Sequence, residues 1–156
     1  MKLRNYLNIA LIIIWMLTIF NFSHQNSTES SGLSDKIIVK IAETLSKKEL
    51  SATEKRHIIK KYKLLVRKAA HFISYFILGT LIIILFIDLK INIKKSNLIT
   101  LIICFIYACT DEIHQLFISG RNGSFIDVLI DTFGAATSLI IIYLLLLIKR
   151  KCIKQK

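Results

Sequence analysis

Four long apolar runs alternate with polar, mostly basic segments along the chain. The runs cover Leu7–Phe22, Ala69–Ile87, Leu98–Ile118 and Phe125–Ile148. The last three are each about 20 residues long, the length that an α-helix needs to cross a hydrocarbon core of about 30 Å. The pattern predicts an all-α integral membrane protein in which four transmembrane helices form an antiparallel bundle, within a single domain that covers residues 1–156.

The composition supports this interpretation. Hydrophobic residues make up 54% of the 156 residues, the mean hydropathy is +0.57, and the chain contains no proline, which favours unbroken helices. Charged residues still reach 21%, so they must be segregated from the apolar runs. The net charge is +12, but the basic residues flank the apolar runs and form no nucleic-acid-binding motif. We therefore expect membrane lipids, and no nucleic acid, as partners.

The distribution of Lys and Arg bears on the orientation of the spans. The two sides of the membrane carry nearly equal numbers of basic residues. The short Lys149–Lys151 flank and the usual dominance of the first helix favour both termini in the cytoplasm. No small-residue cleavage site follows Phe22, so the first run is expected to remain as a signal anchor.

The loop of residues 26–68 contains two stretches with helical periodicity. In the first, the residues of one face are apolar and those of the other are charged: Ile37, Ile38, Ile41 and Leu45 against Lys36, Lys40, Glu43 and Lys47. The second begins at Ser51, where Ser-Ala-Thr-Glu matches a capping box. Both stretches are predicted to be amphipathic helices that lie on the membrane surface with a basic polar face. A solvated charged loop is the alternative.

Ionisable residues within or beside the spans gather near one membrane face. Each costs about 2.5–3.5 kcal/mol on insertion scales, so each needs a structural or functional reason. Spacings of three or four residues place them on common helix faces, and the antiparallel topology brings those faces to the same side. The group consists of His24, Gln25, Arg67, Lys68, His71, Tyr75, Asp111, Glu112, His114, Gln115, Arg121, Asp127 and Asp131.

This polar group suggests a pocket one or two turns below the membrane surface. Neighbouring carboxylates and an imidazole in a desolvated site are suited to proton transfer. Cations at the rim could hold a phosphate or carboxylate. The catalytic candidates are His71, Asp111, Glu112 and Asp127. The candidates for substrate binding are Gln25, Arg67, Lys68, Tyr75, Gln115, Arg121 and Asp131.

A metal centre made of His71, His114 and acidic ligands is the less favoured alternative. Asp-Glu-x-His, as it occurs at residues 111–114, is not a recognised ligand spacing. We therefore predict no metal site, and the sequence indicates no particular cofactor.

The same residues carry a family resemblance. The motifs are Arg67-Lys68-Ala69-Ala70-His71-Phe72-x-x-Tyr75, Asp111-Glu112-x-x-Gln115-x-Phe117, Arg121, Asp127-Val128-x-x-Asp131-x-x-Gly134 and Phe22-x-x-Gln25. In this order, and over about residues 6–145, the chain resembles the VanZ-like membrane protein family. Many members have Asn at the position of Asp131, so the chain has an additional carboxylate there.

The resemblance implies a four-helix membrane protein linked, through the founding member of the family, to low-level resistance to teicoplanin. Together with the Ile- and Lys-rich composition, it implies the plasma membrane of a Gram-positive bacterium. It assigns no reaction, so whether the chain is an enzyme stays open. The open functions are chemistry on a lipid or lipid-linked wall precursor at the outer leaflet, non-catalytic binding of an amphiphile such as a lipoglycopeptide, and a structural salt-bridge network. Ion or proton transport is the least favoured function.

Overall fold

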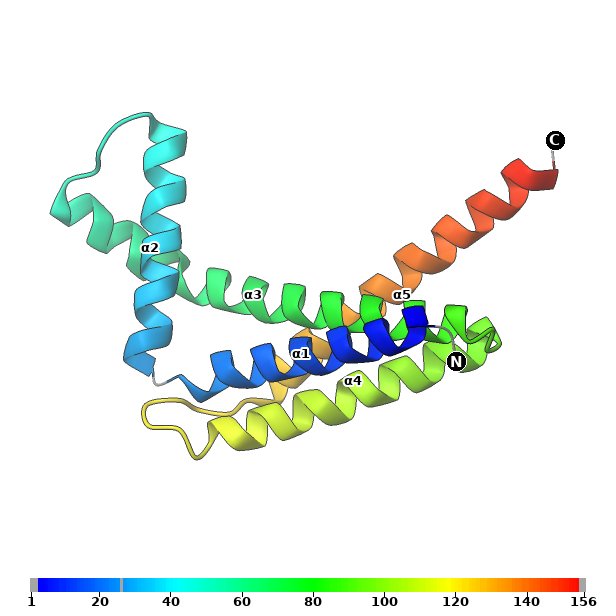
Figure 1. Cartoon of the computed structure of the whole chain (residues 1–156). Helices are drawn as coiled ribbons and strands as arrows, with labels where there is room; N and C mark the ends of the chain where they lie inside the picture. The colour runs from blue at the N-terminus through cyan, green and yellow to red at the C-terminus, as the bar shows by residue number, and fades with distance from the viewer. Residues whose placement is uncertain (1–2, 26, 155–156) are drawn as a thin grey trace.

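The computed structural model describes residues 3–25 and 27–154, which form five α-helices (Figure 1). They are α1 (Leu3–His24), α2 (Ser27–Ser46), α3 (Ala52–Asp88), α4 (Ile93–Gln115) and α5 (Phe125–Lys154). No strand occurs in these residues. Residues 1–2, 26 and 155–156, which belong to the predicted domain and its first loop, lie outside the described residues.

Within the described part of the chain, four helices are long and apolar enough to cross a membrane: α1, α3, α4 and α5. Successive spans run in opposite directions, and both ends of the chain lie at the end of the bundle that is remote from α2 (Figure 1). The prediction of an all-α membrane protein with four spans is therefore confirmed. The ends of α1, α4 and α5 differ from the ends of their apolar runs by a few residues. Polar flanking residues extend α1, α5 and the start of α4, whereas α4 ends at Gln115, before the third run ends.

The helix α3 extends far beyond the predicted second span. It is capped at Ser51, whose side chain accepts a hydrogen bond from the backbone N–H of Glu54, while the Glu54 side chain accepts one from the backbone N–H of Ser51. The predicted capping box is thus confirmed. Residues 52–78 contain no Gly or Pro that would interrupt the helix. The second amphipathic stretch is therefore not a separate helix, and the boundary expected at Ala69 lies inside α3.

The helix α2 crosses α3 near the N-terminal part of α3 (Figure 1). Lys55 Nζ lies 2.9 Å from Glu43 Oε1, and Lys63 Nζ lies 3.4 Å from Asp35 Oδ1. The hydrogen bond from Lys55, followed by one from the backbone N–H of Leu50, lowers the pKa of Glu43. This carboxylate therefore stays ionised, and its contacts with α3 persist, to a lower pH than for a free Glu.

The apolar face predicted for α2 is partly buried and partly exposed. Ile38 is buried, whereas Ile37, Ile41 and Leu45 are exposed. An exposed apolar stripe next to membrane-spanning helices is suited to contact with the lipid surface.

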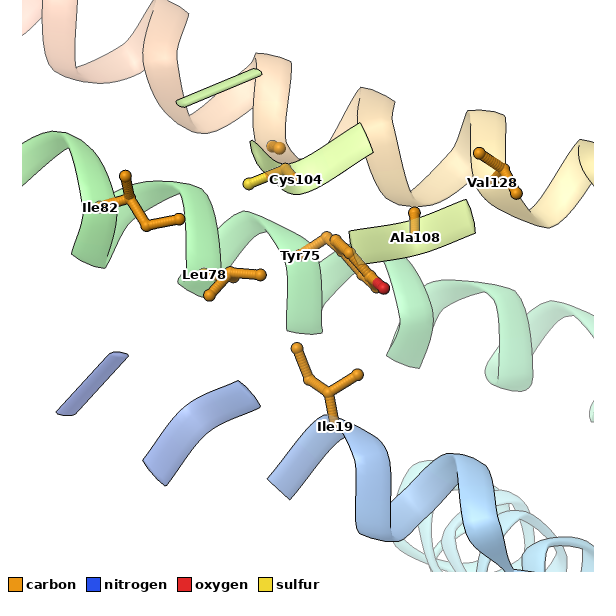
Figure 2. Close-up of a cluster of buried hydrophobic side chains, with 8 residues drawn as sticks. Ile19, Tyr75, Leu78, Ile82, Cys104, Ala108 and Val128 are labelled. Atoms are coloured by element: carbon orange, nitrogen blue, oxygen red, sulfur yellow. The ribbon is translucent and has the colours of Figure 1, made fainter. Parts of the chain in front are cut away.

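The interior of the bundle is organised around α3, which contacts each of the other four described helices. Ile19 of α1, Tyr75 and Leu78 of α3, Ala108 of α4 and Val128 of α5 belong to one buried cluster (Figure 2). Large apolar side chains also cover the outside of the spans. Lipid tails are as apolar as these side chains, so close packing and polar contacts, rather than the hydrophobic effect, hold the spans together.

Two glycines allow α3 and α5 to approach each other closely. A Cβ atom on Gly79 would lie 2.6 Å from Ser138 Oγ, and a Cβ atom on Gly134 would lie 2.3 Å from the carbonyl oxygen of Phe72. The Phe72 oxygen belongs to the backbone of α3, so it cannot move without moving the helix. Small residues at such contacts are the usual way for transmembrane helices to come close together.

Replacing Gly134 by Ala is expected to destabilise the bundle by about 1–3 kcal/mol, because the added methyl group would force the two helix backbones apart. The unfolding midpoint of the purified protein in detergent measures this effect. Gly32→Ala in α2 is the matched control, since a Cβ atom there meets nothing within 4 Å. Equal midpoints for the two variants would contradict the close contact.

Candidate functional site

The C-terminal end of α4 carries three polar side chains into the interior of the bundle. Asp111, Glu112 and Gln115 are buried, and they continue the buried face that contains Cys104 and Ala108. Their spacing of three and four residues puts them on one side of the helix. A polar site is therefore built where an apolar interior would otherwise continue.

Gln115 connects the two carboxylates of α4 to each other and to α3. Its Nε2 atom donates to Glu112 Oε1 at 3.1 Å and to Asp111 Oδ2 at 3.3 Å, while its Oε1 atom accepts from Arg67 Nη2 at 3.2 Å. Ser23 of α1 also donates, from Oγ to Asp111 Oδ2 at 2.8 Å. Arg67 is thus connected to the carboxylates through the amide of Gln115.

The turn between α4 and α5 closes over Glu112. The backbone N–H of Ser124 donates to Glu112 Oε2 at 2.8 Å, and Ser124 Oγ accepts from the backbone N–H of Ile126 at 3.2 Å. Gly123 permits this close contact, because a Cβ atom there would lie 2.3 Å from the carbonyl oxygen of Glu112. Both carboxylate oxygens of Glu112 are therefore held by neutral donors.

His71 of α3 meets Asp131 of α5 beside these residues. His71 Nδ1 lies 3.4 Å from Asp131 Oδ1, and the Asp131 side chain is fully buried. Ligand atoms of His71, Asp111, Glu112 and Asp131, one from each residue, all lie within 4.8 Å of one another. We call these four residues the carboxylate–histidine cluster.

Cationic side chains surround the cluster without pairing with it. Lys68 Nζ lies 2.8 Å from Asp127 Oδ1, so Asp127 has its own cation beside the cluster. Arg121 Nη2 donates to the carbonyl oxygen of Phe22 at 2.8 Å. Burial and the neighbouring Arg67 lower the pKa of Arg121. Among the described residues, neither Lys nor Arg forms an ion pair with a carboxylate of the cluster.

Two cavities adjoin the cluster on different sides of α3. The first has a volume of about 230 Å³ and lies between α1, α2 and α3, with Ile19, Leu33 and Ile37 among its apolar lining residues. The second has a volume of about 220 Å³ and is lined by polar residues of α3, α5 and the turn before α5. Arg67 and His71 line both cavities.

The predicted site residues lie at different positions in the structure. His71, Asp111, Glu112 and Asp131 form the cluster, with Gln115 and Arg67 bonded around it. Lys68 and Asp127 pair with each other beside it, while Gln25 and Tyr75 line the first cavity. Arg121 binds the end of α1. Which of these residues act in catalysis or in substrate binding stays a prediction.

Two predicted neighbours, His24 and His114, do not join the cluster. His114 Nε2 lies 3.2 Å from His24 Nδ1, and both rings stack with Phe20. Conversely, Ser23 and Ser124 contribute donors that the sequence analysis did not identify. The sequence signal that could have identified them is their position at the ends of spans, because a polar residue there can reach the end of a neighbouring helix.

Comparison with protein families matches residues 8–147 to the family described as VanZ/LLP1. The matched region contains the whole carboxylate–histidine cluster and both cavities. Comparisons with curated proteins and with solved structures gave no significant match.

Replacing Gln115 by Leu is expected to destabilise the protein by about 1–3 kcal/mol, because it leaves buried polar groups of Asp111, Glu112 and Arg67 without their shared partner. Thermal unfolding in detergent measures the loss. Thr110→Val on the same helix is the control: Thr110 is exposed and bonds only the carbonyl of Tyr107 among the described residues. Its effect is expected to stay within about 0.5 kcal/mol. Similar losses for the two variants would argue against a connecting role for Gln115.

Proposed function

This chain belongs to the VanZ/LLP1 family, and we propose that it is a cell-envelope membrane protein that binds an amphiphile with an anionic headgroup. The observation that carries the proposal is the cavity of about 230 Å³, which is mainly apolar but is also lined by Arg67 and His71. Ligand sites in proteins commonly combine an apolar lining with a few polar groups that orient the ligand.

The apolar part of the cavity is suited to a segment of an alkyl chain. It lies between two membrane-spanning helices and the amphipathic α2, so its lining comes from elements that contact lipid. Leu33 and Ile37 of α2 line the cavity on one side, and Ile19 and Ala70 line it from the spans. An amphiphile in the membrane could therefore place part of its chain there without leaving an apolar environment.

The polar part is suited to a phosphate or carboxylate group. Arg67 has five N–H donors in a planar fork, and its hydrogen bond to Gln115 engages one amino group. Lys68 lines the second cavity together with Asn122 and pairs with Asp127. An anionic headgroup near Arg67 would meet the guanidinium group while the alkyl chain remains in the first cavity.

The proposal extends to the location and the biological role. With both termini in the cytoplasm, the cluster and both cavities face the outer leaflet of a bacterial plasma membrane. A lipid or a lipid-linked wall precursor of a Gram-positive envelope then becomes the proposed ligand, and binding or modification of it would alter susceptibility to teicoplanin. The catalytic candidates His71, Asp111 and Glu112 lie together, and His71 lines the cavity beside which the headgroup would bind. This proximity supports proton transfer as the chemistry to test. The pair of Asp127 and Lys68 adjoins them.

A structural salt-bridge network is the second candidate function. The hydrogen bonds of Gln115 and the pair of Lys68 with Asp127 favour it. Such a network accounts for the polar contacts but gives no role to the adjoining cavity.

Filling the first cavity is expected to weaken amphiphile binding. Ala70 lines this cavity and the adjacent Ala69 does not, so Ala70→Phe and Ala69→Phe are a matched pair of variants. We expect Ala70→Phe to weaken binding of dodecyl phosphate about tenfold, which corresponds to about 1.4 kcal/mol, and Ala69→Phe to change it less than about twofold. The rise of the unfolding midpoint with dodecyl phosphate, measured in lipid nanodiscs, reports binding.

Two further probes separate the contributions of the chain and the headgroup to this binding. Dodecanol and inorganic phosphate should each stabilise the protein less than dodecyl phosphate does. Arg67→Gln should reduce the advantage of dodecyl phosphate over dodecanol. If both Phe variants respond to dodecyl phosphate as the wild type does, the cavity does not bind the alkyl chain.

Expression of the wild-type chain in a teicoplanin-sensitive Gram-positive host is expected to raise the inhibitory concentration of teicoplanin. Glu112→Gln and His71→Ala should abolish this protection, because each removes an ionisable group of the cluster. Immunoblots of the membrane fraction confirm that the three proteins are equally abundant. Absence of protection by a well-inserted wild type would remove drug resistance from the proposed function. Protection by all three proteins would mean that the cluster has no part in it.

A further inference from the structure

The carboxylate–histidine cluster receives no ion pair from Lys or Arg among the described residues. It combines three buried carboxylates, whose residues are 3% exposed for Asp111, 5% for Glu112 and 0% for Asp131, with the single imidazole of His71. Lys68 pairs with Asp127, and the guanidinium groups of Arg67 and Arg121 donate hydrogen bonds to neutral oxygens, those of the Gln115 amide and the Phe22 carbonyl group. Buried charges are normally paired or bound to a metal ion.

Three carboxylate oxygens of the cluster have no hydrogen-bond donor among the described residues. They are Asp111 Oδ1 and both side-chain oxygens of Asp131, and all three are buried. The nearest recorded partner of Asp131 is His71 Nδ1 at 3.4 Å, which is longer than an ordinary N–H···O hydrogen bond. These atoms are buried from solvent and retain lone pairs that no described donor uses.

The other oxygen of Asp111 is held firmly in place. Asp111 Oδ2 accepts from Ser23 Oγ and from Gln115 Nε2, while both oxygens of Glu112 accept from Gln115 or Ser124. Metal-binding carboxylates typically show this arrangement, in which outer donors orient the group and a lone pair remains for the metal. The hydrogen bonds thus fix the orientation of the carboxylates and leave lone pairs that can still bind a metal ion.

We propose that His71, Asp111, Glu112 and Asp131 bind a divalent transition-metal ion. Their ligand atoms all lie within 4.8 Å of one another, whereas ligands of a tetrahedral Zn²⁺ ion are about 3.4 Å apart. Small side-chain movements would close this difference. An imidazole nitrogen with carboxylate oxygens suits Zn²⁺ or Mn²⁺, while Mg²⁺ prefers all-oxygen ligands and usually keeps several waters.

The sequence conceals this ligand set because the four residues come from three helices. The spacing Asp-Glu-x-His directed attention to His114, which instead contacts His24. The imidazole of the cluster belongs to α3, and the carboxylate of Asp131 belongs to α5.

A metal ion in the cluster would lie beside the proposed ligand site, since His71 also lines the first cavity. Its positive charge would attract the anionic headgroup of an amphiphile. The metal proposal nevertheless stands on the cluster alone, and its test measures bound metal. Its failure can therefore be distinguished from a failure of amphiphile binding.

The test uses the full chain purified in detergent, treated with EDTA, and then incubated with Zn²⁺ or Mn²⁺ in separate samples. After gel filtration, elemental analysis is expected to find about one equivalent of Zn²⁺ or Mn²⁺ per chain. The bound ion should raise the unfolding midpoint, and Mg²⁺ at the same concentration should not. Cobalt(II) serves as a spectroscopic probe, whose absorption spectrum should change when His71 is replaced by Ala.

Asp131→Asn keeps the shape of a ligand and removes its charge, and we expect it to weaken metal binding by about tenfold or more. Asp127→Asn is the matched control: it lies four residues earlier on α5, pairs with Lys68, and should retain the metal. Glu112→Gln is a second ligand variant, which keeps the test informative if Asp131→Asn does not fold.

A wild-type protein that retains neither ion would overturn the proposal. Equal metal content in the wild type and in a folded ligand variant would do the same.

Discussion

The backbone of α5 lies against the backbone of α3 at Gly134, where only the lack of a Cβ atom leaves room for the carbonyl group of Phe72. His71 immediately precedes Phe72, and Asp131 lies three residues before Gly134. The contact that joins the two helices therefore also sets the distance between the imidazole and the Asp131 carboxylate. Asp111 and Glu112 are oriented separately, by donors from α1, from α4 itself and from the turn before α5.

The distribution of polarity in the bundle is the reverse of that in a soluble protein. Ser96, Thr100, Gln115, Asp131 and Ser138 are fully buried, whereas large apolar side chains cover much of the outside. In lipid, an apolar exterior carries no cost, and an enclosed polar group gains most from meeting a partner on another helix. Of these residues, Gln115 and Asp131 contact side chains of another helix, so they help to specify which helix faces meet, and both belong to the candidate site.

The sequence was a sufficient guide wherever the signal is local. Runs of apolar residues gave the four spans, Ser51 to Glu54 gave the capping box, and the four-residue spacing of Asp111 and Gln115 gave their common face. Antiparallel topology then placed the polar helix ends on the same side. These conclusions need only the periodicity of one helix and the direction of the next.

What the sequence could not supply is the register between helices. The pairing of His71 with Asp131, and that of His24 with His114, depends on how far one helix slides along another, which is fixed by contacts such as Gly134 with Phe72. The continuity of α3 through Ala69 was also missed, because a change from amphipathic to apolar composition suggests a boundary even where no residue breaks the helix. The sequence analysis named Asp131 as a candidate for substrate binding and did not predict its contact with His71.

The unbroken α3 has a mechanical consequence. Its 37 residues extend about 55 Å at 1.5 Å per residue, and the part that α2 crosses belongs to the same rigid rod as Arg67 and His71. A rotation of that outer part is passed on to both side chains, because no glycine or proline interrupts the helix between them. A movement of α2 at the membrane surface would thus change the position of His71 in the buried cluster through α3.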